Sequence, residues 1–326
     1  MKDRLLASSN AQAGFQVTRA GPLALLQDAG RFGVRHLGVT QGGPVDLHAW
    51  AWANHLAANP WGTTALEVTI GGLALVAEQA MTLAITGADL GAQHNQQPAP
   101  YWQAFQVKPG DTLSFATPIN GLRSYLAVAG GFHGEAVMGS TACVVREQLG
   151  GIDGLGHPLR EDDRLMVQKA PRQTREASAT APPSLPDYNA DATLDCLPGA
   201  QIGSFSGKSI FDAFNSQWQV DQRTDRMGVR LTGPRLRCHI DSMISEGISL
   251  GAIQVPPDGQ PIALLNDRQT IGGYPRLGNL TPLAASRLAQ CQPGQKVKLQ
   301  AVSVEVAQRR HQAFLAGFGG SGGGKH

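Results

Sequence analysis

The sequence is poor in the features that mark several classes of protein. Its 326 residues include only four cysteines, and none forms a CxxC pair, so neither a zinc site nor a dense disulfide framework is indicated. No stretch approaches the roughly 20 apolar residues of a membrane helix, and the first residues lack the apolar core of a signal peptide. The net charge is only +2, without the basic stripe that a phosphate backbone would require. We therefore expect a cytoplasmic protein with no metal, membrane or nucleic-acid partner.

Familiar catalytic and nucleotide-binding motifs are missing as well. There is no HExxH and no GxSxG, so metallohydrolase and serine hydrolase chemistry have no support. The run GSFSGKS at residues 203–209 resembles a phosphate-binding loop, but three residues separate its glycines where the motif requires four. Because the cradle depends on a fixed run of backbone N–H donors, this run does not predict ATP binding.

What the sequence does contain is turn formers and short apolar runs. It has 40 glycines and 20 prolines, and 42% of its residues are hydrophobic against 16% charged. Apolar runs at residues 73–77, 81–86 and 125–129 are separated by Gly, Pro and Asn, which is typical of short strands joined by turns. The composition therefore predicts a mainly β fold.

A few short helices interrupt the strands. Asp46 follows a Gly-Gly-Pro turn and is a candidate helix N-cap, and Ala49, Ala53 and Leu56 recur at helical spacing until Asn59. A second short helix is expected over residues 283–289, before the Pro-Gly turn at 293–294.

The length of the chain predicts two domains, because single cores stop growing at roughly 250 to 300 residues. Residues 169–190 gather Pro, Ser, Thr and Ala and lose apolar periodicity, which is typical of a linker. We therefore expect one lobe over residues 15–168 and a second over 191–310. The remaining residues, 311–326, end in a glycine-rich run and are expected to form a flexible tail.

The densest group of polar residues lies between Gly251 and Arg276. An expected strand at residues 262–265 delivers a run of polar side chains at its end, just before a Gly-Gly-Tyr-Pro turn. Binding sites usually occupy such positions. Carboxylates there can move protons and arginines can clamp an anion, which gives catalytic candidates Asp258, Asp267 and Arg268. Candidate substrate-binding residues in the same stretch are Gln254, Gln269, Tyr274 and Arg276. The alternative is that Asp267 and Arg268 merely pair with each other beside a turn.

A second polar cluster lies near the N-terminus, in the run LLQDAGRFGVRHLGV. Gln27, Asp28 and Arg31 could complete the substrate site from the first lobe, because the neighbouring glycines let the backbone approach another group closely. The alternative is a structural loop in which Asp28 caps a turn and Arg31 lies on the surface.

The motifs of both lobes resemble those of one known family. The second lobe carries TDRMGVRLTGP, SEGI and GAIQVPPDGQPIALLNDRQTIGGYPR, and the first carries LLQDAGRFGVRHLGV, ALEVTIGG, ITGADLGA and RSYLAVAGG in the family's order. On these motifs the chain is identified as a member of the family of 5-oxoprolinase C subunits, also called allophanate hydrolase subunit 2 or Kip inhibitor antagonist.

This resemblance implies a pair of cyclophilin-like β-barrel domains and a subunit that does not act alone. Relatives act with a B-type, Kip-inhibitor-like subunit and an A-type subunit to open 5-oxo-L-proline to L-glutamate with ATP. An amide ring of this kind needs an anchor for its carboxylate, a role that suits Arg268 or Arg276. Since the chain lacks a phosphate-binding loop, ATP is expected to bind with the partner subunits.

Two alternatives accompany this prediction. The first is the carboxyltransferase component of a biotin-dependent urea or amide carboxylase. The chain has no lysine flanked by methionines, so any biotin would arrive on a separate carrier. Similar carboxyltransferases often have Tyr-Pro-Lys where this chain has Tyr274-Pro275-Arg276, and arginine cannot act as a base, which favours the oxoprolinase. The second is a non-catalytic regulator that binds a kinase-inhibitor-like B partner.

Overall fold

The fold comprises two compact units. The computed structural model describes residues 11–169, 182, 184–240 and 243–319. The first unit takes residues up to Arg31, then 42–44 and 48–186, and the second takes 32–41, 45–47 and 187 onward. The lobe predicted over residues 15–168 therefore differs from the first unit in two short segments, which belong to the second. Most of the predicted linker lies outside the described residues.

Two antiparallel sheets build the first unit. One has the strand order β11-β1-β4-β9-β6-β7 and the other the order β2-β3-β10-β5-β8. Strands of the first sheet are β1 (Ala11–Ala20), β4 (Leu73–Ala77), β6 (Gln93–His94), β7 (Gln97–Pro98), β9 (Thr112–Ser114) and β11 (Arg164–Gln168). Strands of the second are β2 (Leu23–Gln27), β3 (Ala65–Thr69), β5 (Met81–Gly87), β8 (Ala104–Val107) and β10 (Arg123–Val128).

The strands of this unit differ in how many of their faces are buried. β4 and β11 alternate between buried and more exposed residues, as strands with one face on a core do, whereas every residue of β3 and β10 is buried. The helix α1 (Leu47–Leu56) is tied to the second sheet where Thr86 donates a hydrogen bond to the carbonyl of Ala49, with 2.6 Å between the two oxygens. The core of this unit is an apolar cluster that includes Phe15, Leu83 and Phe132.

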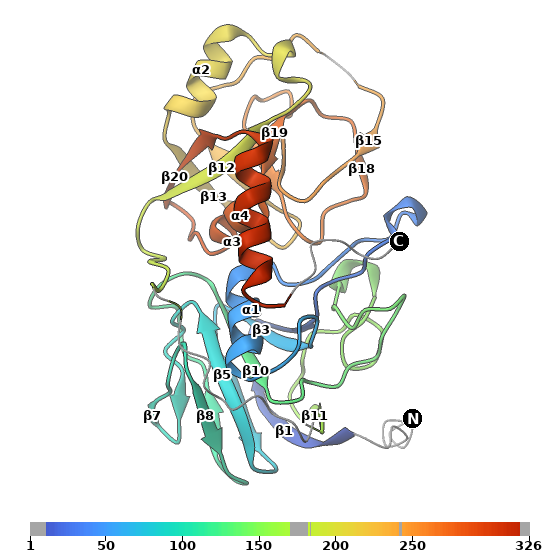
Figure 1. The fold of residues 1–326 in the computed structure, drawn as a ribbon, viewed down its shortest axis with the longest axis vertical. Coiled ribbons are helices and arrows are strands. Elements are labelled where there is room, and N and C mark those ends of the chain that lie inside the picture. Colours follow the sequence, from blue (N-terminus) through green and yellow to red (C-terminus); the bar gives the residue numbers. More distant parts are fainter. Residues whose placement is uncertain (1–10, 170–181, 183, 241–242, 320–326) are drawn as a thin grey trace. The chain divides into compact units, whose positions relative to one another are not determined.

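A closed barrel forms the second unit. Its order is β12-β19-β16-β17-β14-β13-β20, and parallel pairing of β12 with β20 closes it (Figure 1). The barrel strands are β12 (Ala192–Pro198), β13 (Trp218–Thr224), β14 (Gly228–Thr232), β16 (Ala252–Gln254), β17 (Ile262–Leu264), β19 (Arg276–Leu280) and β20 (Lys296–Ala301). β15 (Glu246–Gly247) and β18 (Ile271–Gly272) form a separate pair. Trp218, Leu231 and Leu277 lie in the barrel core.

Hydroxyl caps start the helices of this unit. Ser206 caps α2 (Gly207–Asn215), Thr281 caps α3 (Pro282–Ala289) and Ser303 caps α4 (Val304–Ala316), each accepting a backbone N–H three residues ahead. Pro282 occupies the first helical position of α3, where its missing N–H costs nothing. Short 3-10 turns complete the elements: η2 (Arg35–Leu37), η3 (Val145–Glu147) and η4 (Ile202–Ser204).

The mainly β prediction is confirmed, and so are the helices expected after Asp46 and over residues 283–289. The predicted tail needs one correction. α4 runs on to Ala316, into the segment expected to be flexible from residue 311, because Leu315 on this helix is buried. Within the described part of the chain, no helix is long and apolar enough to cross a membrane.

Candidate functional site

Arg268 is the most buried of the predicted site residues in the second unit, with 2% of its surface exposed. The residue follows β17 in the run that the sequence singled out. Its Nε and Nη1 donate to the carbonyls of Ile248 and Leu265 at 3.2 and 3.0 Å, and its Nη2 lies 3.5 Å from Oε1 of Gln41. The backbone carbonyl of Arg268 accepts a hydrogen bond from the hydroxyl of Thr40. Arg268 is thus held rigidly, by neutral groups only.

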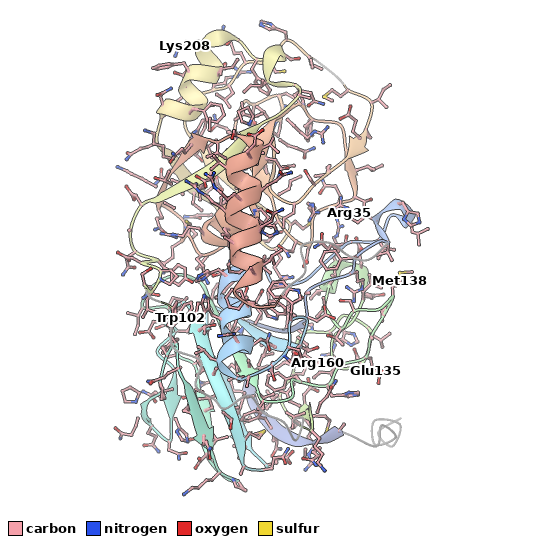
Figure 2. The ribbon with its side chains drawn as sticks, in the orientation of Figure 1. Arg35, Trp102, Glu135, Met138, Arg160 and Lys208 are labelled. Atoms are coloured by element: carbon pink, nitrogen blue, oxygen red, sulfur yellow. The ribbon has the colours of Figure 1, made fainter. Side chains whose placement is uncertain are left out.

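A second arginine approaches the same carbonyl. Arg35, at the start of η2, donates from Nη2 to the carbonyl of Ile248 and to that of Thr270 (Figure 2 labels Arg35). Burial, and secondarily the positive charge of Arg35, lower the pKa of Arg268 to about 9. In the part of the chain that the structure describes, neither arginine forms an ion pair with a carboxylate. The buried guanidinium group of Arg268 and the partly buried one of Arg35 therefore make a positive centre suited to an anion.

Gln254 adds an unused donor beside this centre. It ends β16 and is 3% exposed, and its buried Nε2 has no hydrogen-bond partner among the described residues. A Cβ added to Gly272 would lie 2.7 Å from that Nε2 and 2.5 Å from Cδ1 of Ile248, so only glycine fits between them. The carbonyl of Ile248 also accepts hydrogen bonds from both arginines. One residue, Ile248, is therefore surrounded by Gln254, Arg35 and Arg268. Buried amide donors normally find partners, and a bound ligand would supply one.

Asp267 does not pair with Arg268, contrary to the alternative considered from the sequence. Its carboxylate instead binds Arg226 through two bonds, Nε to Oδ2 at 2.8 Å and Nη2 to Oδ1 at 3.0 Å. Both residues are 6% exposed. The backbone strengthens this link, because the N–H of Asp267 donates to the carbonyl of Arg226. The pair joins the β13–β14 turn to the loop after β17. No local pattern indicates this pairing, since the partners stand 41 residues apart.

The other predicted residues of this stretch are dispersed. The guanidinium group of Arg276 binds the carboxylate of Glu246 and the carbonyl of Gly247, which holds β15 in place. Asp258 is exposed and pairs with Arg230. Tyr274 is exposed on a cavity wall, and Gln269 is half-buried. Only Gln254 and Arg268 of the predicted set therefore belong to the cluster around Ile248.

The predicted residues of the first unit are engaged in structural contacts. The amide of Gln27 donates to the carbonyl of Cys143 and accepts from the N–H of Gly43. Asp28 accepts from the N–H of Gly30, which is the turn-capping role proposed as an alternative, and also from Ser140 and Thr141.

Arg31 is 1% exposed, so the suggestion that it lies on the surface is wrong. It donates to the carbonyls of Val137, Ser140 and Ala142 at 2.9, 3.2 and 2.6 Å. For Gln27, Asp28 and Arg31, substrate binding stays a prediction, and their contacts favour the structural alternative.

The second unit also has a large cavity, of about 1150 Å³. Its walls come from the start of α2, the segment 234–240, residues 255–257 and the turn 273–275. The sequence motifs pointed to the start of α2 only as a failed phosphate-loop match, and they did not point to segment 234–240. Basic residues spaced two apart, as Arg235, Arg237 and His239 are, could have drawn attention to that segment. Among the described residues, no group of three or more His, Cys, Asp or Glu could hold a metal ion.

The chain thus combines a two-unit β architecture with a pair of neighbouring arginines in the second unit, and similarity to known proteins shows its family. The chain belongs to the carboxyltransferase domain family, subdomains A and B, whose model matches residues 37–301. It is 35% identical to the 5-oxoprolinase C subunit of Escherichia coli (strain K12) over 298 residues, which cover 91% of this chain and 94% of that protein. The corresponding 5-oxoprolinase C subunit of Haemophilus influenzae is 34% identical over 90% of this chain and 93% of its own length.

Solved structures agree on the fold. The Kluyveromyces lactis urea carboxylase matches 96% of this chain with a TM-score of 0.85 and 24% identity, and the match spans 29% of that much longer chain. At this identity the likeness concerns the fold alone. The resemblance read from the sequence motifs is thus confirmed by the family and by relatives that match along nearly their whole length.

Proposed function

We propose that this chain is the C-type subunit of an ATP-dependent 5-oxoprolinase, which opens 5-oxo-L-proline to L-glutamate together with A- and B-type subunits. One observation carries the proposal: the 35% identity to a 5-oxoprolinase C subunit extends over 94% of that protein. The match therefore takes in both units and not a single shared domain.

The cluster around Ile248 supports the choice of substrate. A 5-oxoproline molecule carries one carboxylate and one neutral ring amide. Arg268 and Arg35 provide a positive centre that has no ion pair with a carboxylate of the described residues. The Nε2 of Gln254, which has no partner among those residues, can donate to a substrate oxygen. We assign the carboxylate to the arginines and the second contact to Gln254.

The remaining predicted residues take supporting roles in this proposal. Arg276 holds β15, and Asp267 positions the loop that carries Arg268 by binding Arg226. Because Asp267 is buried in a bidentate ion pair, we assign it no proton transfer. Asp258 is ion-paired with Arg230 and lies outside the cluster around Ile248, so its predicted role in proton transfer stays a prediction. ATP would be consumed by the assembled complex.

The test is glutamate release from 5-oxo-L-proline and ATP by this chain mixed with its A and B partners, with each component omitted in turn. We expect release only when all three chains and ATP are present. An inactive complex whose assembly has been verified by size-exclusion chromatography would overturn the proposal.

The family description favours one second candidate, a carboxyltransferase component. The fold likeness to a urea carboxylase points the same way. Under this alternative, the chain would transfer a carboxyl group from a biotinylated carrier to a urea-like amide. Incorporation of labelled bicarbonate into such an amide, dependent on a biotin carboxylase and carrier, would establish it. If no label is incorporated and the complex releases glutamate from 5-oxo-L-proline, the carboxyltransferase alternative is excluded.

A further inference from the structure

The cavity of the second unit carries several basic side chains, and none of its lining residues has been assigned to the substrate above. Among the described residues, its lining includes four basic side chains, those of Lys208, Arg235, Arg237 and His239, and one acidic side chain, that of Asp212. The cluster of Arg35, Arg268 and Gln254 around Ile248 lies outside this lining. A concave site with a charge excess of one sign concentrates ligands of the opposite sign.

Backbone hydrogen bonds fix the walls of this cavity to one another. The N–H of Ser206 donates to the carbonyl of Arg237, and the N–H of Arg237 donates to the hydroxyl of Ser209 at 2.8 Å. The N–H of His239 donates to the carbonyl of Ser204. Ser209 is 3% exposed and also contacts Ser206, so it locks the start of α2 against the basic segment. The cations are therefore presented from a preorganised frame.

Of the basic side chains in the lining, only Lys208 has an acidic partner among the described residues. Lys208 pairs with Asp212 at 2.7 Å along α2 (Figure 2 labels Lys208). Arg235 donates only to the carbonyl of Pro257. Within the described residues, Arg235, Arg237 and His239 have no ion pair with a carboxylate. Three basic groups thus remain available to a ligand.

The start of α2 adds donors on the same side. Gly207 and Lys208 are the first two residues of the helix, so their N–H groups have no acceptor within it. A Cβ added to Gly207 would meet no atom within 4 Å, which leaves the backbone there open to approach. Helix N-termini favour anions, and here the helix end supplements side-chain cations from a different segment.

The lining also includes apolar residues and one aromatic ring. Val255 and Pro256 belong to it, and so does Tyr274, which is an exposed residue. At about 1150 Å³, the cavity exceeds the roughly 300 to 1,000 Å³ of usual small-molecule sites. A ligand that fits carries several negative charges, and the cavity has room for a planar or apolar group besides.

We propose that this cavity binds a small molecule bearing two or more phosphate groups, with Arg235, Arg237 and the start of α2 as the phosphate-binding elements. The glycines at 203 and 207 do not form a phosphate-binding loop, because residues 202–204 make a 3-10 turn and not the end of a strand. In this proposal the phosphate groups bind to Arg235 and Arg237 instead. Arg237 lies 28 residues beyond Ser209 in the sequence, and the hydrogen bond from its N–H to the hydroxyl of Ser209 holds it beside the start of α2.

Calorimetric titration of the chain alone with tripolyphosphate, ATP and adenosine tests this proposal. We expect saturable binding of tripolyphosphate and ATP, weakened by added salt, and none of adenosine. Arg237→Gln is expected to weaken binding of both phosphates about tenfold, since a charge-assisted hydrogen bond contributes roughly that much. ATP binding more tightly than tripolyphosphate would further indicate that the apolar residues of the lining hold the base.

Arg309→Gln is the matched control, because it removes the same charge from an exposed position on α4. It should change binding less than twofold. The proposal fails if neither phosphate compound binds at millimolar concentration, or if both variants weaken binding equally. Since no partner subunit or 5-oxo-L-proline is present, this failure would leave the glutamate-release test unaffected.

Discussion

Two buried arginines, one in each unit, show how similar burial can serve different ends. Arg31 of the first unit and Arg268 of the second are 1% and 2% exposed, and each donates hydrogen bonds to backbone carbonyls. Arg31 reaches three carbonyls of one short loop, at residues 137, 140 and 142. Arg268 binds carbonyls from two segments and lies beside a second cation, Arg35.

The two arginines differ in what surrounds them. The carbonyls of residues 137, 140 and 142 accept hydrogen bonds from the guanidinium group of Arg31, and their loop would lose these bonds without it. Around Arg268, burial and the charge of Arg35 lower the pKa to about 9, so the charged form is disfavoured there. A protein retains an unfavourable buried charge most readily where a ligand uses it. We therefore interpret Arg31 as structural and Arg268 as functional.

The largest effect is expected from Arg31→Met. This change removes three hydrogen bonds from a charged donor to backbone carbonyls, and hydrogen bonds of this kind contribute about 1.5–3 kcal/mol each. We expect the free energy of unfolding to fall by roughly 3–5 kcal/mol, measured by urea denaturation. Glutamate release per folded complex should stay unchanged. Arg309→Met, on the exposed face of α4, should change stability by no more than about 0.5 kcal/mol.

Arg268→Met should have the opposite effects, a small loss of stability and a large loss of activity. Removal of a charge that burial and Arg35 disfavour is expected to cost only about 1 kcal/mol of stability. The rate of glutamate release by the full complex should fall at least ~100-fold, which corresponds to about 2.7 kcal/mol of transition-state stabilisation. Arg268→Lys should not restore it, because an ammonium group lacks the planar pair of donors. Unchanged turnover with a stability loss like that of Arg31→Met would show that the two arginines are equivalent.

The fold was more predictable from the sequence than the site, and the reason is physical. Apolar runs and turn residues are local signals, so strands such as β4 and β5 and the helix α3 were found close to their true bounds. The closed barrel depends on pairings such as β12 with β20, about a hundred residues apart, which no local pattern reveals.

The site depends on the same kind of distant pairing. Arg268 was selected because it ends a strand beside glycines, but its neighbour Arg35 comes from residues 32–41, which the sequence assigned to the other lobe. The ion pair between Asp267 and Arg226 could not be predicted from the sequence either. Residue type told us which side chains can do chemistry, whereas only the fold told us which of them meet.

The smallest effect, and the one that most sharpens the comparison, is expected from Gln254→Met. A buried amide donor without a partner destabilises the unliganded protein, so its replacement by an apolar side chain of similar size should leave stability unchanged or raise it by up to about 1 kcal/mol. If Gln254 donates to substrate, the same change should raise KM for 5-oxo-L-proline about tenfold, equivalent to roughly 1.4 kcal/mol. Urea denaturation and steady-state glutamate release measure the two effects separately. A stability loss of the size expected for Arg31→Met, with KM unaltered, would place Gln254 with the structural residues and would leave the arginine pair as the sole anchor.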